Sequence, residues 1–250
     1  MHSDFQTYRF VMSLSLFAAF LLALTATTLK DKQDYNIEVD RKKNVLKCAG
    51  VDVSKLESNE VIKTYKNVIR EKVLSEKGEI INITHAELEN SEDKSTGQIY
   101  YLNSGKEYLP LFEHQANGKL NAYILPISGK GLWSTLYGYF ALDQDLNTVK
   151  GITFYKHGET PGLGGEVEKE WFQNNFINKT IFDENDNFVS IIVAKGVATG
   201  KKINNKVDGM SGATITGTGL TTFLKADLKR YLPFINKQKV NEKLNEEIGV

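Results

Sequence analysis

Two glycine-rich loops carry the residue types in this chain that are best suited to chemistry. The first is His157-Gly158-Glu159-Thr160-Pro161-Gly162-Leu163-Gly164-Gly165, with four glycines and one proline in nine residues. Glycine leaves the backbone unscreened, so main-chain N–H and C=O groups can approach a flat ligand closely. Composition alone favours a plainer interpretation, in which the loop only connects a strand that ends at Tyr155 to the next helix.

The second loop is Asp208-Gly209-Met210-Ser211-Gly212-Ala213-Thr214-Ile215-Thr216, where small residues surround three hydroxyl groups. Such a hydroxyl is accessible to another enzyme, and a helix that begins just beyond it would favour an anion there. No neighbouring base makes Thr214 a catalytic nucleophile in its own right, so modification by a partner enzyme is the better hypothesis. A Ser/Thr helix-capping loop is the alternative that composition favours.

The common catalytic and metal-binding motifs are missing from the sequence. It contains no Walker A sequence, complete G-x-G-x-x-G motif, H-E-x-x-H, C-x-x-C or G-x-S-x-G nucleophile elbow. The four histidines show no ligand spacing, and the single cysteine, Cys48, excludes an intramolecular disulfide and an all-cysteine cluster. We therefore expect no metal site. The 31 basic and 31 acidic residues balance, which argues against a nucleic-acid partner.

An uncharged run at residues 10–29 predicts a transmembrane helix behind a short tail at residues 1–9. At 1.5 Å per residue it covers roughly 30 Å, the thickness of the hydrocarbon core. The absence of a good cleavage site favours a retained anchor over a signal peptide. One arginine precedes the run and five Lys/Arg residues follow it closely, which would place the C-terminal part in the cytoplasm. Long domains cross membranes largely regardless of charge, so this pattern does not settle the orientation.

The remaining chain predicts an α+β fold with an antiparallel sheet, because strands and helices do not alternate regularly. We expect a juxtamembrane linker at residues 30–55 with room for one short strand, a helix-and-strand part at 56–125, the domain core at 126–235 and a polar tail at 236–250.

Within these parts, apolar spacing predicts a helix from Ser58 to Gly78, a strand at 80–83 and an acidic, turn-rich loop at 87–98. Hairpins follow at 108–127, around Asn117-Gly118, and at 135–155. A short helix at 167–177, a strand at 188–195 and an amphipathic helix at 220–231 complete the expected elements.

The two loops, in this order, resemble a known family. Asp208-x-x-Ser211-Gly212-Ala213-Thr214 resembles the recognition motif of the bacterial flavin transferase, whose last threonine is esterified to the phosphate of FMN taken from FAD. The stretches Gly131-Leu132-Trp133-Ser134, Tyr137-Gly138-Tyr139 and Gly151-Ile152-Thr153-Phe154-Tyr155, leading into Glu159-Thr160-Pro161-Gly162-Leu163-Gly164, resemble the C subunit of the sodium-translocating NADH:quinone oxidoreductase. The G subunit of the related Rnf complex shares both loop motifs but is usually shorter, so it ranks second.

The resemblance covers nearly the whole chain and implies an electron-transfer subunit with an antiparallel-sheet FMN-binding domain behind one transmembrane helix. The complex would oxidise NADH, reduce ubiquinone and export sodium ions. Its A, B, D, E and F subunits and membrane lipid would be the partners. The resemblance also implies the bacterial inner membrane, with the soluble domain on the periplasmic side, which disagrees with the charge pattern. A non-redox anchored module for sensing or assembly is the alternative of a different class.

Carried over residue by residue, the resemblance makes Thr214 the covalent attachment site of FMN, installed by the flavin transferase. The residues that shape the loop around the phosphate would be Ser211, Gly212 and Ala213; those that line the ring would be Glu159, Thr160, Gly162, Leu163 and Gly164, with Trp133 and Ser134 close by. Trp133 is equally well explained as a buried core aromatic. Lys195 suits a solvated strand end better than the ring edge. Asp208 suits recognition by the transferase, and Thr216 is a bystander and the fallback attachment site.

Overall fold

The computed structural model describes residues 4–248, with side chains described as far as residue 241. The chain divides into two compact units, residues 1–41 and residues 42–250. The antiparallel sheet and the helices of the second unit confirm the predicted α+β class.

Helix α1 (Asp4–Cys48) contains the whole uncharged run. Among the described residues it is the one helix long and apolar enough to cross a membrane, with a mean hydropathy of 2.1 over its most apolar window and no burial of that window. The predicted short strand within residues 30–55 is wrong, because α1 continues to Cys48. No glycine or proline interrupts that stretch. The helix ends where Gly50 takes φ +83° and the N–H groups of Gly50 and Val51 bind the carbonyls of Lys47 and Leu46.

The second unit is built on an antiparallel sheet of eight strands in the order β2-β1-β5-β6-β7-β8, with β4 paired to β5 and β3 paired to β4. The strands are β1 (Ile69–Ser75), β2 (Ile80–Ile81), β3 (Glu89–Glu92), β4 (Ile99–Asn103), β5 (Lys106–Ala116), β6 (Lys119–Lys130), β7 (Thr135–Leu142) and β8 (Val149–Lys156). The predicted hairpins β5–β6 and β7–β8 are confirmed. Asn117 and Gly118 both take positive φ in the first of them, as a tight hairpin turn requires.

Two predictions in the first half of this unit are wrong. Helix α2 (Ser58–Val68) stops ten residues before Gly78, because β1 takes over at Ile69 and pairs along its whole length with β5. The apolar residues Ile69 and Val73 suit either structure, and tertiary pairing decides. The acidic stretch 87–98 is also not a plain loop. It holds β3, whose four exposed residues pair with β4, and a turn in which Asp93 accepts hydrogen bonds from Ser95 and Thr96.

Beyond β8 the chain forms a short 3₁₀ turn (Gly164–Glu168), α3 (Glu170–Asn174), β9 (Ile192–Val193), a 3₁₀ turn (Ile203–Asn205), β10 (Lys206–Val207) and α4 (Thr214–Ile248). The helix predicted at 167–177 is shorter than expected. The strand predicted at 188–195 shrinks to β9, because Ser190 at φ +69° interrupts the extended run. Strand β9 pairs in parallel with β10.

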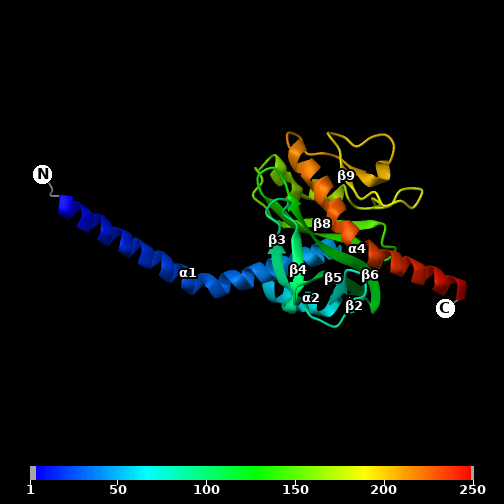
Figure 1. Ribbon diagram of the computed structural model, residues 1–250, viewed down its shortest axis with the longest axis horizontal. Helices are drawn as coiled ribbons and strands as arrows, with labels where there is room; N and C mark the ends of the chain where they lie inside the picture. Colours follow the sequence, from blue (N-terminus) through cyan, green and yellow to red (C-terminus); the bar gives the residue numbers. More distant parts are fainter. Residues whose placement is uncertain (1–3, 249–250) are drawn as a thin grey trace. The chain divides into compact units, whose positions relative to one another are not determined.

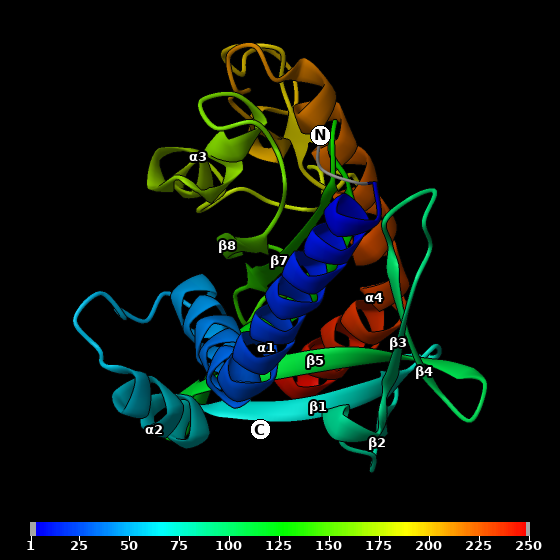
Figure 2. The ribbon, with the colours of Figure 1, turned by 90° about the vertical axis from the view of Figure 1, so that its left-hand side faces the viewer.

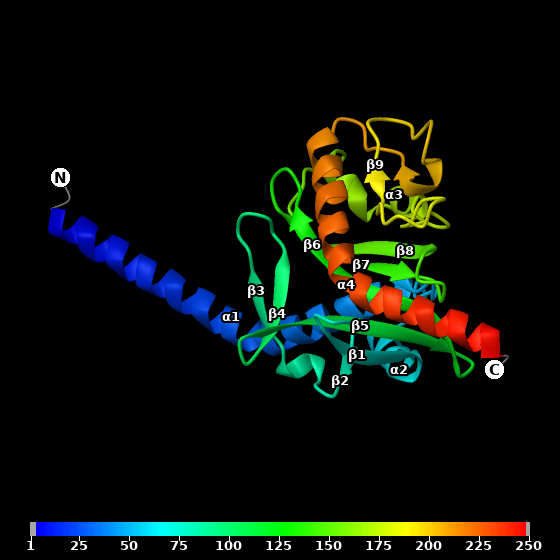
Figure 3. The same cartoon turned by 45° about the vertical axis from the view of Figure 1, so that its right-hand side comes forward.

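Helix α4 is longer than predicted at both ends and packs against β6. It continues as far as Ile248, into the stretch predicted as a polar tail, with Pro233 inside it. Figure 3 shows its orange and red parts running in different directions. Glycine permits its close approach to the sheet: a Cβ on Gly129 would lie 2.1 Å from Phe223, and one on Gly219 would lie 2.1 Å from the Lys130 carbonyl oxygen.

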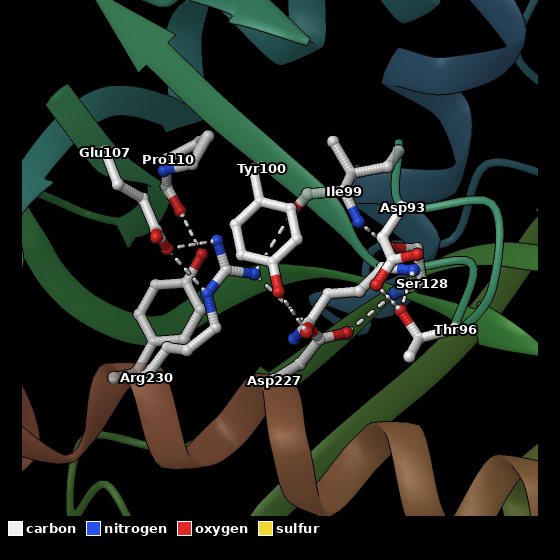
Figure 4. Close-up of polar contacts among 11 residues, drawn as sticks. Asp93, Thr96, Ile99, Tyr100, Glu107, Pro110, Ser128, Asp227 and Arg230 are labelled. Atoms are coloured by element: carbon white, nitrogen blue, oxygen red, sulfur yellow. Dashed lines mark hydrogen bonds and ion pairs between the residues drawn. The ribbon is translucent and has the colours of Figure 1, made fainter. Parts of the chain in front are cut away.

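A buried polar network fixes the middle of α4 to the sheet (Figure 4). The Arg230 guanidinium donates to the Glu107 carboxylate at 2.7 and 3.0 Å, to the Ile99 carbonyl and to Asp227. Asp227 in turn accepts from the Ser128 N–H at 2.7 Å and from the Gln98 amide at 2.8 Å. Burial raises the pKa of Asp227 to about 6, although these partners oppose the rise. The helix is therefore held in one register against β4, β5 and β6.

We expect the Arg230→Met variant to lose about 3 kcal/mol of unfolding free energy, because it leaves the buried Asp227 and the Glu107 carboxylate without their cation. The Lys237→Met variant is the matched control, since it removes the exposed ion pair with Glu79. It should lose less than about 1 kcal/mol. Urea titration of the detergent-solubilised full chain measures both. Equal losses in the two variants would contradict the role given to Arg230.

Candidate functional site

The site lies where α4 begins. Figures 1 and 2 show this orange end of the helix at the same end of the domain as the yellow loops that follow α3, away from β1 and β2. Thr214 is the first residue of the helix and its side chain is exposed. The Ala213 carbonyl accepts the first helical hydrogen bond, from the Gly217 N–H. The N–H groups of a first helical turn lack partners within the helix, so this end suits an anion carried by Thr214.

The three hydroxyls of the second loop differ in accessibility. Ser211 and Thr214 are exposed, whereas Thr216 is 1% exposed and its Oγ1 donates to the Glu159 carboxylate at 2.7 Å. Successive residues of a helix point about 100° apart, so turning Thr216 inward turns Thr214 outward. Burial removes Thr216 as a fallback nucleophile in the folded chain. Gly212 takes φ +71° and Ala213 is buried. These two small residues come directly before Thr214.

Glu159 is the most highly connected residue at the site. Its carboxylate accepts hydrogen bonds from the N–H groups of Leu132, Trp133 and Ser134 at 3.1, 2.9 and 3.0 Å. It also accepts from the Ser134 hydroxyl at 3.2 Å and from Thr216. Burial alone would raise the pKa of Glu159, but these hydrogen bonds outweigh it and hold the pKa below its usual value. The group is therefore an ionised carboxylate, only 5% exposed, that joins three segments of the chain.

Two glycines of the site serve this carboxylate. A Cβ on Gly131 would lie 2.7 Å from Glu159 Oε1, and a Cβ on Gly164 would lie 2.7 Å from both Glu159 Oε2 and Thr216 Oγ1. Gly162 is different, because its φ of +75° requires glycine while the space around it is open. The Thr160 carbonyl accepts hydrogen bonds from Leu163 and Gly165 and closes the turn. Of the three glycines, Gly162 is the exposed one, whereas Gly131 is half-buried and Gly164 is buried.

Four large apolar side chains on the segments that meet near the start of α4 are exposed. We call Leu132, Trp133, Leu163 and Ile215 the apolar rim. Trp133 is 73% exposed, so the interpretation of it as a buried core aromatic is wrong. Leu163 lies near the Thr214 loop, since a Cβ on Gly212 would come within 2.8 Å of its Cδ2. An exposed apolar surface beside an anion site is suited to a flat ring carried on a phosphate.

Other residues singled out from the sequence lie outside this cluster. Asp208 accepts a hydrogen bond from the Ala198 N–H at 2.7 Å and so organises the loop before the motif. Lys195 is exposed, next to Gly196, whose carbonyl binds Gly209. Cys48 is buried, and burial raises the pKa of its thiol far above the usual value. Among the described residues, no group of three or more His, Cys, Asp or Glu side chains could hold a metal ion.

Sequence reasoning missed a groove of about 500 Å³ beside the site. It runs along α4 from Ile215 to Ala226, opposite the turn at residues 95–98 that joins β3 to β4. Reading residues 87–98 as a loop hid it, because the hairpin brings Thr96 and Gln98 to the helix. The Thr96 carbonyl accepts the Lys130 N–H, which fixes this turn to the end of β6.

Comparison with known proteins places this geometry in a family. Residues 131–229 match the family model described as an FMN-binding domain, and this range includes Glu159, Thr214 and the apolar rim. The chain is 34% identical to the C subunit of the Na(+)-translocating NADH-quinone reductase of Yersinia pestis, over 86% of this chain and 85% of that protein. It is 32% identical to the protein of the same name from Pseudomonas aeruginosa, over 89% and 90%.

Solved structures agree with the sequence comparison. The crystal structure of the C subunit of the Na(+)-translocating NADH-quinone reductase from Parabacteroides distasonis matches with a TM-score of 0.69 and 31% identity, over 83% of this chain and 96% of that one. The crystal structure of Shewanella oneidensis NqrC matches with a TM-score of 0.65 and 27% identity, over 80% of this chain and 96% of that one. The resemblance found in the sequence is confirmed, and it includes the fold.

Proposed function

Because the chain belongs to the family of the Na(+)-translocating NADH-quinone reductase C subunits, we propose that it carries FMN as a phosphoester on Thr214 and transfers electrons within that complex. The observation that carries this proposal is the difference in exposure between two threonines at the start of α4. Thr214 is exposed, while Thr216 is buried and donates to Glu159. When bound, FMN supplies the redox chemistry, and the protein supplies binding, orientation and electrostatics.

Attachment requires another enzyme. In the reaction proposed, the Thr214 hydroxyl oxygen attacks the phosphorus of the FMN half of FAD, an O–P bond forms, and the pyrophosphate bond breaks to release AMP. The hydroxyl proton leaves in the same step. The structure supports the need for a flavin transferase, because the carboxylate that reaches this helical turn, Glu159, is already engaged by five hydrogen bonds. Once formed, the phosphate would lie at the positive end of the α4 dipole.

The ring is proposed to lie on the apolar rim, with the open backbone at Gly162 beside it. Trp133 and Leu163 offer apolar side chains. The Thr160 carbonyl holds the backbone of Leu163, and Glu159 holds the backbone of Trp133 and Ser134. Gly164 leaves the room that the Glu159 carboxylate occupies. Ser211, Gly212 and Ala213 would keep the path from tether to ring free of bulky side chains. Glu159 therefore supports the ring site from beneath and does not present its carboxylate to the ring.

The proposed setting is an inner-membrane complex with A, B, D, E and F subunits that oxidises NADH, reduces ubiquinone and exports sodium. Helix α1 would anchor the chain in lipid, with the domain on the periplasmic side. An Rnf-type G subunit is less well supported, because such subunits are usually shorter, whereas the chain matches proteins named as C subunits over 86% and 89% of its length. A non-redox module would carry no covalent flavin, so the next experiment also separates that alternative.

We expect the Thr214→Ala variant, coexpressed with the transferase, to fold, insert in the membrane and lose covalent FMN completely, because only the nucleophile is removed. The Thr218→Ala variant is the matched control, since it removes an exposed hydroxyl one turn further along α4. It should retain the adduct. Intact mass of the purified chains measures both. An adduct that persists on Thr214→Ala would move the site to Ser211, and an unmodified wild-type chain would favour the non-redox module.

For the ring, we expect attached FMN to quench the fluorescence of Trp133 more strongly than that of Trp171. These are the two tryptophans of the chain, and Trp171 lies on α3, where its Nε1 donates to Glu166. Two variants, Trp171→Phe and Trp133→Phe, leave one reporter each. Comparing each with and without Thr214→Ala gives the quenching. Equal quenching of both reporters would contradict a ring seated on the apolar rim.

For the orientation, we expect a membrane-impermeant maleimide to label the Lys94→Cys variant in intact spheroplasts and to leave the Thr7→Cys variant unlabelled. Both positions are exposed, and they lie on either side of the uncharged run. Cys48 is buried and gives little background. The reverse labelling pattern would place the domain in the cytoplasm, as the flanking charges alone suggest.

A further inference from the structure

The hydrogen bond between Thr216 and Glu159 joins residues 57 positions apart, and it connects the attachment loop to the apolar rim. On one side, Thr216 lies in the first turn of α4, two residues after Thr214. On the other side, the same carboxylate holds the backbone of Leu132, Trp133 and Ser134. One buried anion therefore fixes both the rotation of the first helical turn and the segment that carries Trp133.

Packing and hydrogen bonding restrict the Glu159 carboxylate to one position. Glu159 is a buried charge whose described partners are hydrogen-bond donors, so each lost donor leaves the charge less well compensated. Gly131 and Gly164 leave no room for a Cβ between the carboxylate and its neighbours. A side chain at either glycine would therefore push the carboxylate away from its hydrogen-bond donors. The donors and the glycines thus hold one geometry.

We infer that Glu159 and Thr216 form a latch that positions the Thr214 hydroxyl for flavin attachment and positions Trp133 relative to the attached flavin. Both are positioning residues, since neither presents its polar atoms to the ligand. With Thr216 directed inward, Thr214 faces outward toward the transferase, and the tether starts at a fixed place relative to the rim. The inference rests on the proposed function, because it assigns the second threonine of the motif a task in attaching and seating the same cofactor.

The test compares three variants of the full chain, coexpressed with the transferase in membranes. Thr216→Val keeps the shape and removes the donor, Thr216→Ser keeps the hydroxyl, and Thr218→Val removes a hydroxyl that bonds only within α4, to the Thr214 carbonyl. We expect Thr216→Val to acquire FMN about tenfold more slowly than wild type, as the loss of a hydrogen bond to a charged group implies. Thr216→Ser should restore the rate, and Thr218→Val should match wild type.

A second readout separates positioning from plain stabilisation. In the Trp171→Phe background, the flavin that does attach to Thr216→Val should quench Trp133 less than in wild type, and its reduction potential should differ. Both are measured below the melting temperature of each variant. Thr216→Val with wild-type attachment rate, Trp133 quenching and potential would overturn the inference.

A further variant keeps the test decisive if Thr216→Val does not fold. Gly164→Ala retains both latch residues but inserts a Cβ 2.7 Å from Glu159 Oε2 and Thr216 Oγ1. It should slow attachment and weaken Trp133 quenching in the same way, and unchanged values would overturn the inference. The proposed function and the latch would be contradicted by different results. A wild-type chain without FMN on Thr214 removes the proposed function and the latch's role with it, whereas a flavinylated wild type matched by the variants removes the latch alone.

Discussion

The candidate site depends on a buried carboxylate that has hydrogen-bond donors in place of a cation. Glu159 is 5% exposed, and keeping it ionised there requires several donors at short range. Three consecutive N–H groups, at Leu132, Trp133 and Ser134, meet this requirement because the chain turns sharply before β7. A further donor, the Thr216 hydroxyl, comes from α4. The turn, the glycine loop and the helix start are thus placed by one charge, and the glycines at 131 and 164 are explained by its size.

Helix α4 connects the sheet to this end of the domain and is fixed to the sheet at several points. Its middle is fixed by Arg230 and Asp227, and its closest approach to β6 is made possible by Gly129 and Gly219. A helix held at those points has little freedom of rotation, so the direction of its first turn is set before any ligand binds. Glu159 then fixes that turn locally. Under the proposed function, the long helix and the buried carboxylate would serve the same requirement, which is a hydroxyl held at a defined place on a rigid element.

Elements that local signals specify could be predicted from the sequence. Elements and site contacts that depend on residues far apart in the chain could not. Asn117-Gly118 specifies its hairpin by turn geometry, and the apolar run specifies a long helix by composition. Strand β1 was mistaken for helix because its apolar spacing suits both, and pairing with β5 settles the matter. A short motif singled out Thr214, and the structure shows it exposed at the start of α4. The pairing of Thr216 with Glu159 was not identifiable in this way, because no local pattern relates residues 57 apart, and Thr216 therefore looked like a bystander.

Under the proposed function, the exposed rim and the tether explain each other. Trp133 at 73% exposure and Ile215 at 59% are too open to hold a small ring tightly by area alone. The covalent bond proposed at Thr214 would change that requirement, because an attached ring would meet the rim at a high effective concentration and would need little intrinsic affinity. A shallow seat would also leave part of the ring accessible, which suits the proposed electron exchange with other subunits better than a closed pocket. In the proposed function, weak seating, permanent attachment and a rigid starting point for the tether are therefore parts of one arrangement, in which the carboxylate of Glu159 relates the seat to the tether.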